Sequence, residues 1–252
     1  MKMDSIYVVM PAYNEEENIE AVVRQWYPVL EMAGEQSRLV IADNGSKDAT
    51  HEILMKLKES MPQLEILEKT DRYHGPKVIA LYKYAIKNGA DYIFQTDSDG
   101  QTNPEEFAAF WQLRDKYDAV LGHRSVRGDG KSRAFVEHVV CFLLRCIFGV
   151  KVPDANAPYR LMKASLVDKY IDRLPEDFNI PNIMFTTYFA YYQERITFRE
   201  ISFKPRQGGV NSINIPRIIK IGWKAVGDFR KLKREMWGYQ NEHNNEFVDK
   251  NI

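Results

Sequence analysis

The chain has few cysteines, no net charge and no long apolar run among its 252 residues. Cys141 and Cys146 lie five residues apart, a spacing that fits neither a disulfide framework nor a zinc site, so we expect reduced thiols of a cytoplasmic protein. Zero net charge provides no overall attraction to nucleic acid, which is not expected as a partner. The longest uninterrupted apolar run, Val139–Leu144, is far shorter than the roughly 20 residues that span a bilayer. The first apolar run, Ile6–Met10, stops at Pro11, so no signal peptide is expected either.

The length and composition are those of a folded α/β protein with a short extension. Hydrophobic residues make up 44% and charged residues 28% of the chain, as in ordinary globular domains. We expect one α/β domain over residues 1–214 and a basic amphipathic helical extension over residues 215–238. The polar, Asn-rich residues 239–252 are expected to be disordered.

Apolar strands alternate with amphipathic helices through the first half of the chain. Strands are expected at Ile6–Met10, Leu39–Ala42 and Tyr92–Phe94, because each is continuously apolar and is followed by polar turn residues. This alternation is typical of a mostly parallel sheet flanked by helices in a nucleotide-binding domain. Ligands of such sheets bind at the carboxyl ends of the strands, where Asp43 and Asp97 lie.

Two carboxylates and an amide follow the strand that ends near Thr96. In an extended segment, side chains two residues apart share a face, so Asp97 and Asp99 can converge on one point. Two carboxylates that close repel each other unless a cation or a proton lies between them. With the amide oxygen of Gln101 they form a hard-oxygen set that suits Mg²⁺ or Mn²⁺.

Of three other interpretations of this acidic turn, one is excluded and two stay open. An EF-hand loop is excluded, because its sixth and twelfth positions counted from Asp97 are Thr102 and Ala108 instead of Gly and Glu. A phosphatase-type aspartyl nucleophile also follows a strand in an Asp-x-Asp pattern. A solvated acidic turn without a ligand is the third possibility.

Three motifs occur in the order and spacing of a known family. Val9–Glu15, Asp43–Asp48 and Asp97–Gln101 together resemble the family 2 glycosyltransferases of GT-A fold, and within them most closely the dolichol- or polyprenyl-phosphate sugar transferases. The resemblance runs from about residue 5 to about residue 215, and it includes Gly122–Arg124, the acceptor-side segment Asp154–Leu161 and the Gly-rich segment Phe203–Ser212.

This resemblance implies a nucleotide-sugar donor, a divalent metal and a set of site residues. The predicted metal ligands are Asp97, Asp99 and Gln101. The predicted donor contacts are Pro11, Ala12, Tyr13, Glu15, Asp43, Asp97 and Ser98. Lys77, after a Gly-Pro turn, is a further predicted diphosphate contact. The alternatives are core packing for Tyr13, a first-turn acid for Glu15 and a solvated lysine at a helix start for Lys77. The residues predicted to act in catalysis are Asp99, Asp154, Arg124, Arg133 and Arg206.

Two departures from the family pattern bear on specificity. Asn44 stands where the family often has a second acid, so contacts to the nucleobase or ribose are expected to differ. The Gln-x-x-Arg-Trp signature of processive polysaccharide synthases is absent, so repeated chain extension is not expected.

The second half of the chain supplies basic residues and one further acid. A glycine-broken basic segment over residues 124–133 predicts a mobile flap over phosphates, with a solvated charged loop as the alternative. Arg206, in a Gly-rich segment, is a predicted phosphate clamp. Asp154 would act as a general base if the acceptor is a sugar hydroxyl. It would orient an acceptor that is a lipid phosphate, and a plain turn acid is the third possibility.

Two apolar-basic stretches, residues 135–148 and 215–237, need a cover. The protein's own sheet or a membrane would provide one, and we favour an anionic membrane surface, because an acceptor with a lipid tail would require it. We therefore predict a metal-dependent inverting glycosyltransferase that acts on polyprenyl phosphate at the cytoplasmic face of the membrane, peripherally bound and with a possible membrane-anchoring partner subunit. The alternatives are transfer to a sugar hydroxyl of a lipid-linked or soluble glycan, and a nucleotide-sugar-binding subunit without turnover.

Overall fold

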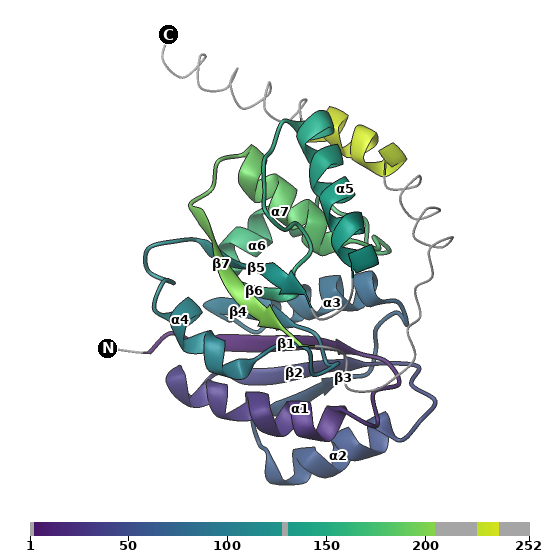
Figure 1. The fold of residues 1–252 in the computed structure, drawn as a ribbon. Coiled ribbons are helices and arrows are strands. Elements are labelled where there is room, and N and C mark those ends of the chain that lie inside the picture. The colour runs from purple at the N-terminus through teal and green to yellow at the C-terminus, as the bar shows by residue number, and fades with distance from the viewer. Residues whose placement is uncertain (1–2, 128–130, 205–225, 237–252) are drawn as a thin grey trace.

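A seven-stranded mixed sheet forms the centre of the molecule, with helices on both faces (Figure 1). The computed structural model describes residues 3–127, 131–204 and 226–236. The strands are β1 (Ile6–Ala12), β2 (Arg38–Asp43), β3 (Leu64–Leu67), β4 (Tyr92–Thr96), β5 (Ala119–Arg127), β6 (Tyr159–Lys163) and β7 (Ile196–Phe203). The helices are α1 (Ile19–Trp26), α2 (Thr50–Ser60), α3 (His74–Lys87), α4 (Phe107–Trp111), α5 (Lys131–Phe148), α6 (Ala164–Ile171) and α7 (Pro181–Tyr191). Short 3₁₀ helices, η1 (Tyr27–Met32) and η2 (Pro104–Glu106), follow α1 and precede α4.

The strand order is β3-β2-β1-β4-β6-β5-β7. β1 pairs in parallel with β2 and β4, and β5 pairs in parallel with β7, whereas β6 runs antiparallel between β4 and β5. The predicted mostly parallel α/β sheet of GT-A type is confirmed, and the reversed strand β6 is the feature that the sequence pattern did not indicate.

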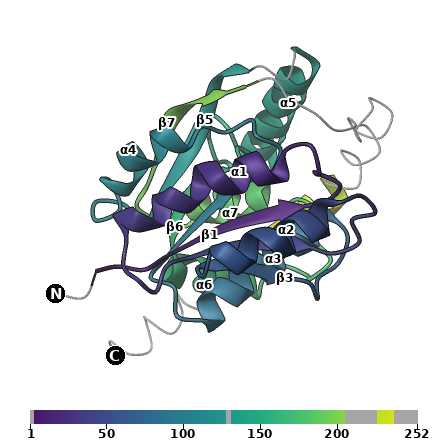
Figure 2. The same ribbon diagram turned by 90° about the horizontal axis from the view of Figure 1, so that it is seen from below.

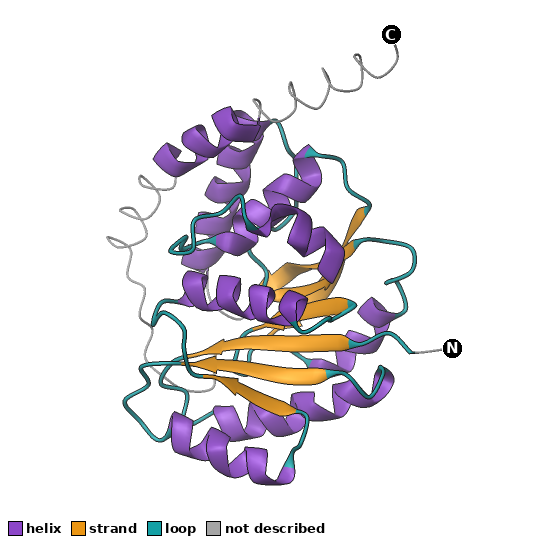
Figure 3. Cartoon of the chain, turned by 180° about the vertical axis from the view of Figure 1, so that it is seen from behind, coloured by secondary structure: helices purple, strands orange, loops and turns teal. Residues whose placement is uncertain are grey.

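Side chains of the central strands alternate between two buried layers. On β1, Val8 and Met10 join the cluster covered by α1, α2 and α4, while Tyr7 and Val9 join the cluster covered by α3, α6 and α7. Figure 3 shows the two helical layers from behind. These strands are covered by helices on both faces, so both faces have to be apolar. This explains why the predicted strands are continuously apolar.

Aromatic rings fill the layer beneath α1. Phe94 lies 5.2 Å from Trp26, 5.1 Å from Phe107 and 4.7 Å from Tyr159, measured between ring centroids. All four rings are almost completely buried. Aromatic pairs at these distances add to the stabilisation that burial of their area provides. The cluster fixes β4 between β1 and β6, and so fixes the turn that carries Asp97.

The described part of the C-terminal extension packs on the protein itself. Residues 226–236 are helical, and they bury Phe229, Leu232 and Met236 in the cluster that also contains α5 and α7 residues. Phe229 contacts Phe148 at 5.8 Å between ring centroids. For these residues the apolar face is therefore covered by protein and not by lipid, contrary to the cover we favoured from the sequence. The rest of residues 215–238, and the tail 239–252, lie outside the described residues.

The aromatic layer makes a prediction about stability. Phe94→Ala should lower the free energy of unfolding by about 3–5 kcal/mol, because it leaves a cavity among rings that cannot collapse freely. Urea unfolding measures this, with Met32→Ala as the control, since Met32 is 42% exposed and should change stability by less than about 0.5 kcal/mol. A Phe94→Ala variant as stable as the control would contradict the description of this layer.

Candidate active site

Three parallel strands, β1, β2 and β4, end at the same edge of the sheet (Figure 1), and Figure 2 shows β1 from below. Ala12 and Asp43 are neighbours in the β1–β2 register, and Thr96, the last residue of β4, lies opposite Tyr159, the first residue of β6. Because β6 is reversed, the segment that precedes it arrives at the edge where the parallel strands end. The predicted donor motifs and the acceptor-side segment with Asp154 thus reach one edge of the sheet.

Asp43 and the residues after β1 form a hydrogen-bonded pair of loops. Asp43 is buried, with Oδ1 accepting from the Ser46 hydroxyl at 2.5 Å and Oδ2 lying 3.2 Å from Nδ1 of His51. The backbone N–H of Glu15 donates to Thr50 at 2.8 Å, and the buried Glu15 carboxylate accepts from Asn18. These contacts hold the two loops together and leave the Tyr13 ring 45% exposed.

Lys77 is buried beneath the same loops. Its ammonium group donates to the carbonyl oxygen of Ala12 and lies 5.4 Å from the centroid of the Tyr13 ring. Burial lowers the pKa of Lys77, while the charges of Asp43 and Asp71 oppose the shift. Lys77 thus supports the loop that carries Pro11, Ala12 and Tyr13, and its contact with a diphosphate stays a prediction.

The turn after β4 brings the predicted metal ligands to the edge of the sheet. Oδ1 of Asp97 lies 3.2 Å from Nε2 of His74 and accepts from Nε2 of Gln95 at 3.2 Å. Desolvation opposes protonation of His74, but the hydrogen bond to Asp97 and the charges of Asp97 and Asp99 outweigh it and raise the pKa of His74. The buried Ser98 hydroxyl donates to the carbonyl oxygen of Pro11 at 2.8 Å and ties this turn to the loop after β1.

Asp99 and Gln101 occupy different surroundings in this turn. Asp99 is partly exposed, and its Oδ1 accepts from the Gln101 backbone N–H at 3.2 Å. The Gln101 side chain is buried, and its Nε2 donates to the carbonyl oxygen of Lys204 at 2.8 Å. The Lys204 N–H donates back to the Gln101 carbonyl at 2.9 Å, so the end of β7 is fixed beside the turn. Gln101 as a metal ligand stays a prediction.

The side chains of this turn fit a divalent cation that takes some of its ligands from the protein and the rest from a substrate. Asp97 and Asp99 offer carboxylate oxygens, which Mg²⁺ and Mn²⁺ accept. Across the residues that the structure describes, no three His, Cys, Asp or Glu side chains cluster closely enough to hold a metal ion. Diphosphate oxygens and water would therefore have to complete the coordination shell.

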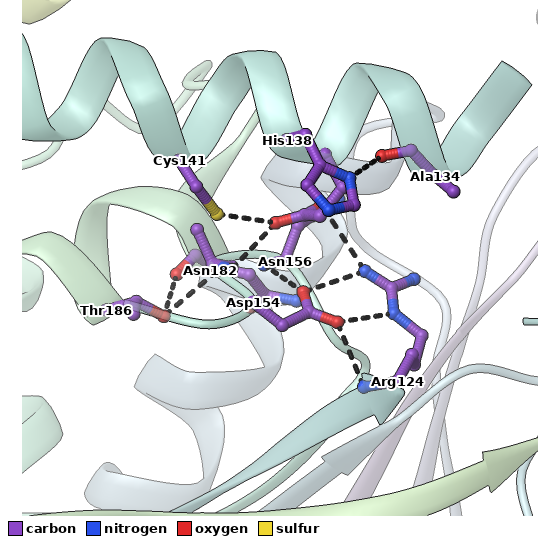
Figure 4. A network of polar contacts seen from close by, with 10 residues as sticks. Arg124, Ala134, His138, Cys141, Asp154, Asn156, Asn182 and Thr186 are labelled. Carbon is purple, nitrogen blue, oxygen red and sulfur yellow. Dashed lines mark hydrogen bonds and ion pairs between the residues drawn. The ribbon is translucent and has the colours of Figure 1, made fainter. Parts of the chain in front are cut away.

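Asp154 forms a two-pronged ion pair with Arg124 (Figure 4). Its Oδ2 accepts from Nε of Arg124 at 2.8 Å and its Oδ1 accepts from Nη2 at 2.9 Å. The backbone N–H groups of Arg124 and Asn156 also donate to this carboxylate. Both side chains are buried, and although burial alone would raise the pKa of Asp154, the hydrogen bonds and charge of Arg124 lower it.

Glu137 of α5 is a third charged residue in this cluster, and the sequence analysis missed it. Its Oε1 accepts from the Ala155 N–H at 2.8 Å, and its Oε2 lies 3.4 Å from Nη2 of Arg124. Burial, followed by the negative charge of Asp154, raises the pKa of Glu137. Its position as the one acid in the apolar-basic stretch 135–148 was the signal that could have found it.

The expected basic flap is mostly regular structure. Arg124 and Arg127 belong to β5, and Arg133 belongs to the first turn of α5, so the connection shrinks to residues 128–130, which lie outside the described part. Arg124 points into the buried cluster and not over an open phosphate site. The side chain of Arg133 and the whole of Arg206 lie outside the described residues, and their catalytic roles stay predictions.

A mostly parallel sheet flanked by helices, with an Asp-x-Asp turn at the edge where its parallel strands end, is the arrangement of GT-A proteins. Residues 7–171 match the family model described as Glycosyl transferase family 2, which covers well over half of the chain. The chain therefore belongs to this family and is a glycosyltransferase.

Curated relatives agree with this assignment. An uncharacterized glycosyltransferase of Synechocystis sp. is 26% identical over 92% of this chain and 71% of its own length. An undecaprenyl-phosphate 4-deoxy-4-formamido-L-arabinose transferase of Salmonella paratyphi B is 23% identical over 88% of this chain and 66% of its own length. The chain thus spans about two thirds of the length of these relatives.

The fold is shared with glucosyl-3-phosphoglycerate synthase from Mycobacterium tuberculosis, solved with UDP. The TM-score is 0.63 at 16% identity, over 91% of this chain and 80% of that one. At this identity the likeness supports the fold alone.

The Arg124–Asp154 ion pair allows a prediction about the free energy of unfolding. Arg124→Met should lower the free energy of unfolding by about 3–5 kcal/mol, because it leaves Asp154 buried without its partner. The double variant Arg124→Met/Asp154→Leu should recover at least half of that loss, since it removes both charges together. Urea unfolding at pH 7 measures both. Equal losses in the single and the double variant would argue against a coupled pair.

Proposed function

We propose that this glycosyltransferase is metal-dependent and inverting, and that it moves a sugar from a nucleotide sugar to polyprenyl phosphate at the cytoplasmic face of the membrane. In a single displacement, an oxygen of the acceptor phosphate forms the new bond to the anomeric carbon. The bond from that carbon to the donor diphosphate breaks, and the configuration inverts. The diphosphate leaves with both electrons of the broken bond.

The observation that carries the choice of acceptor is the Arg124–Asp154 ion pair. A general base needs a free lone pair and a pKa near the working pH. Both oxygens of Asp154 accept from Arg124, and the pKa of Asp154 is lowered. A phosphate acceptor is already ionised and requires no base, so it matches a carboxylate that is committed elsewhere. The relative named as an undecaprenyl-phosphate sugar transferase supports the same acceptor class.

The donor side is proposed from the same edge of the sheet. The exposed Tyr13 ring provides a surface for a nucleobase, and it belongs to one of the two bonded loops that carry Glu15 and Asp43. Asp97 and Asp99 would hold Mg²⁺ or Mn²⁺, which when bound acts as a Lewis acid on the leaving diphosphate. A structure of the phosphoglycerate synthase mentioned above, with the same fold, contains Mn²⁺ and UDP-glucose. The donor is accordingly a UDP- or GDP-linked sugar in this proposal.

A second acceptor class has one observation in its favour. Glu137 lies mostly out of solvent beside Asp154, and its pKa is raised by this partial burial and by the charge of Asp154, as a base for a hydroxyl acceptor would require. Transfer to a sugar hydroxyl of a glycan would use this carboxylate, or Asp154 after Arg124 moves. A subunit that binds nucleotide sugar without turnover is disfavoured, because Asp97 and Asp99 both reach the edge of the sheet.

The exposed face of α5 is the proposed membrane contact. Phe135 is 70%, Val139 40% and Phe142 65% exposed. Arg145 lies on the same exposed side of the helix, and the exposed basic residues of the neighbouring helical stretch are Arg230, Lys231, Lys233 and Arg234. Aromatic rings flanked by cations are typical of a peripheral helix on an anionic surface. None of the described helices is both long and apolar enough to cross a bilayer. A membrane-anchoring partner subunit remains part of the proposal.

The proposed chemistry predicts the behaviour of Asp99→Asn. The change keeps the size of the side chain but removes one ligand charge, so folding should survive while turnover falls by roughly 10²–10³-fold. The measurement is nucleotide release from UDP- and GDP-sugars with a short polyprenyl phosphate in the presence of Mn²⁺, with a free oligosaccharide as the competing acceptor. Normal turnover in Asp99→Asn would remove the metal assignment, and transfer to the oligosaccharide alone would establish the second acceptor class.

The α5 face predicts binding to lipid vesicles. The wild-type chain should sediment with anionic vesicles at low salt and much less at high salt, since each basic residue near the surface contributes about 1 kcal/mol that salt screens. Phe135→Ser/Phe142→Ser should weaken this binding. Met55→Ser serves as the matched control, because Met55 is 43% exposed on α2, on the opposite side of the sheet (Figure 1). A wild-type chain that ignores anionic vesicles at low salt would contradict the membrane contact.

A further inference from the structure

Three buried polar side chains connect the interior of the molecule to Asp97. The Tyr82 hydroxyl of α3 donates to Oδ1 of Asn182 at 3.1 Å. Nδ2 of Asn182, near the start of α7, donates to Oε1 of Gln95 at 2.9 Å, and Nε2 of Gln95 on β4 donates to Oδ1 of Asp97 at 3.2 Å. Tyr82, Asn182 and Gln95 are each at most 3% exposed. They form a continuous line of three hydrogen bonds that ends on a predicted metal ligand.

The direction of every hydrogen bond in this line follows from its last member. An ionised carboxylate only accepts, so Gln95 has to present its NH₂ group to Asp97. The Gln95 oxygen then faces Asn182, which in turn has to present its own NH₂ group. The Asn182 oxygen is left for Tyr82, whose hydroxyl donates. All three donors therefore point toward Asp97, and hydrogen bonds aligned in this way strengthen one another in a buried environment.

The line determines which oxygen of Asp97 is available to a ligand. The contacts of Asp97 with Gln95 and His74 are both made by Oδ1. No residue in the described part of the chain donates to Oδ2. The carboxylate is thus held by one oxygen, with the other one left for a cation at the edge of the sheet.

Buried polar side chains lower the stability of a core when their hydrogen bonds are incomplete, so their presence here calls for a specific role. Gln95 lies on a strand whose neighbours Ile93 and Phe94 are completely buried, where an apolar side chain would pack without any partner. A buried amide that loses one hydrogen bond costs about 1–3 kcal/mol. Such a network is therefore vulnerable to substitution, and a role at the site accounts for its presence better than stability does.

The same helix also reaches the acceptor side. One turn after Asn182, the Thr186 hydroxyl donates to the carbonyl oxygen of Ala155 at 2.9 Å and accepts from Nη2 of the buried Arg160. Ala155 directly follows Asp154, and Figure 4 shows Asn182 and Thr186 beside the Asp154 cluster. Helix α7 thus holds groups next to both Asp97 and Asp154.

We propose that Gln95, Asn182 and Tyr82 are positioning residues that hold Asp97 with Oδ1 toward the protein and Oδ2 toward the cation and diphosphate of the donor. The inference rests on the proposed metal-dependent donor binding, which it deepens by naming the residues that orient one ligand. Gln95 acts directly on Asp97, whereas Asn182 and Tyr82 act through Gln95.

The first test measures binding of UDP and GDP at increasing Mn²⁺ concentration and without metal. Gln95→Met removes the donor to Asp97. Asn182→Asp keeps the shape but accepts only, so Gln95 has to turn its NH₂ group away from Asp97. Both should raise the Mn²⁺ concentration for half-maximal nucleotide binding about tenfold, as expected for a lost hydrogen bond to a charged group, with metal-free binding unchanged. Tyr82→Phe, at the far end of the line, should raise it less.

Thr187→Val is the matched control for a buried polar loss in α7. Thr187 is completely buried, and its hydroxyl donates only to the Ile183 carbonyl within the helix. This variant should keep the wild-type Mn²⁺ dependence. If Gln95→Met and Asn182→Asp also keep it, or if they weaken metal-free binding equally, the positioning role is overturned.

A second test does not depend on the metal. In a double-mutant cycle of Gln95→Met with Asp97→Ala, measured by urea unfolding without metal, the two stability changes should be coupled, because both remove the same hydrogen bond. Additive changes would overturn the inference. If the cycle shows coupling but the wild-type protein binds nucleotide independently of Mn²⁺, the link from Gln95 to Asp97 is retained. The Mn²⁺-independent binding would overturn the proposed metal dependence, and with it the proposal that Gln95 positions a metal ligand.

Discussion

The candidate site depends on one constraint, the common edge at which β1, β2 and β4 end. Parallel strands place their carboxyl ends side by side, so Ala12, Asp43 and Asp97, which are far apart in the chain, come to the same edge of the sheet. The aromatic contacts of Phe94 with Trp26 and Tyr159 fix the position of β4 in the sheet, and so fix where Asp97 lies at this edge. The hydrogen bonds of Lys77 and Ser98 to backbone carbonyls then fix the loops that extend beyond the edge.

Buried charge accounts for the pairing in the cluster around Asp154. Arg124 and Arg160 are cations almost completely removed from water, and Asp154 and Glu137 are the acids near them. In a low-dielectric interior an unpaired charge is far more costly than a paired one, so the carboxylate that is best paired stays ionised while its neighbour binds a proton more readily. The opposite pKa directions of Asp154 and Glu137 follow from this arrangement. The same pairing makes Asp154 a poor base, which favours a phosphate over a hydroxyl as the acceptor.

The repeating pattern of strand and helix was readable from the sequence because it depends on local periodicity. The apolar runs before Pro11, Asp43 and Asp97 predicted three strands of the sheet correctly, and the polar residues after them marked its ligand-binding edge. The reversed direction of β6 was not readable, because it depends on pairing with β4 and β5, far away in the chain. The burial of Lys77 and Gln101 depends on contacts between distant segments in the same way, so residue type and spacing alone could not reveal it.

The reversal of β6 has a consequence for how such a protein can diversify. The segment between α5 and β6 enters the site from the edge that also receives the donor loops, yet its two ends are fixed independently, by α5 on one side and by the pairing of β6 with β4 on the other. The segment is nevertheless no free surface loop, because Asp154 and Ala155 are buried and are bonded to Arg124 of β5, Glu137 of α5 and Thr186 of α7. In the proposed function, a change of acceptor preference would therefore have to exchange this segment together with its partners on β5, α5 and α7, while the loops after β1 and β2 keep their geometry.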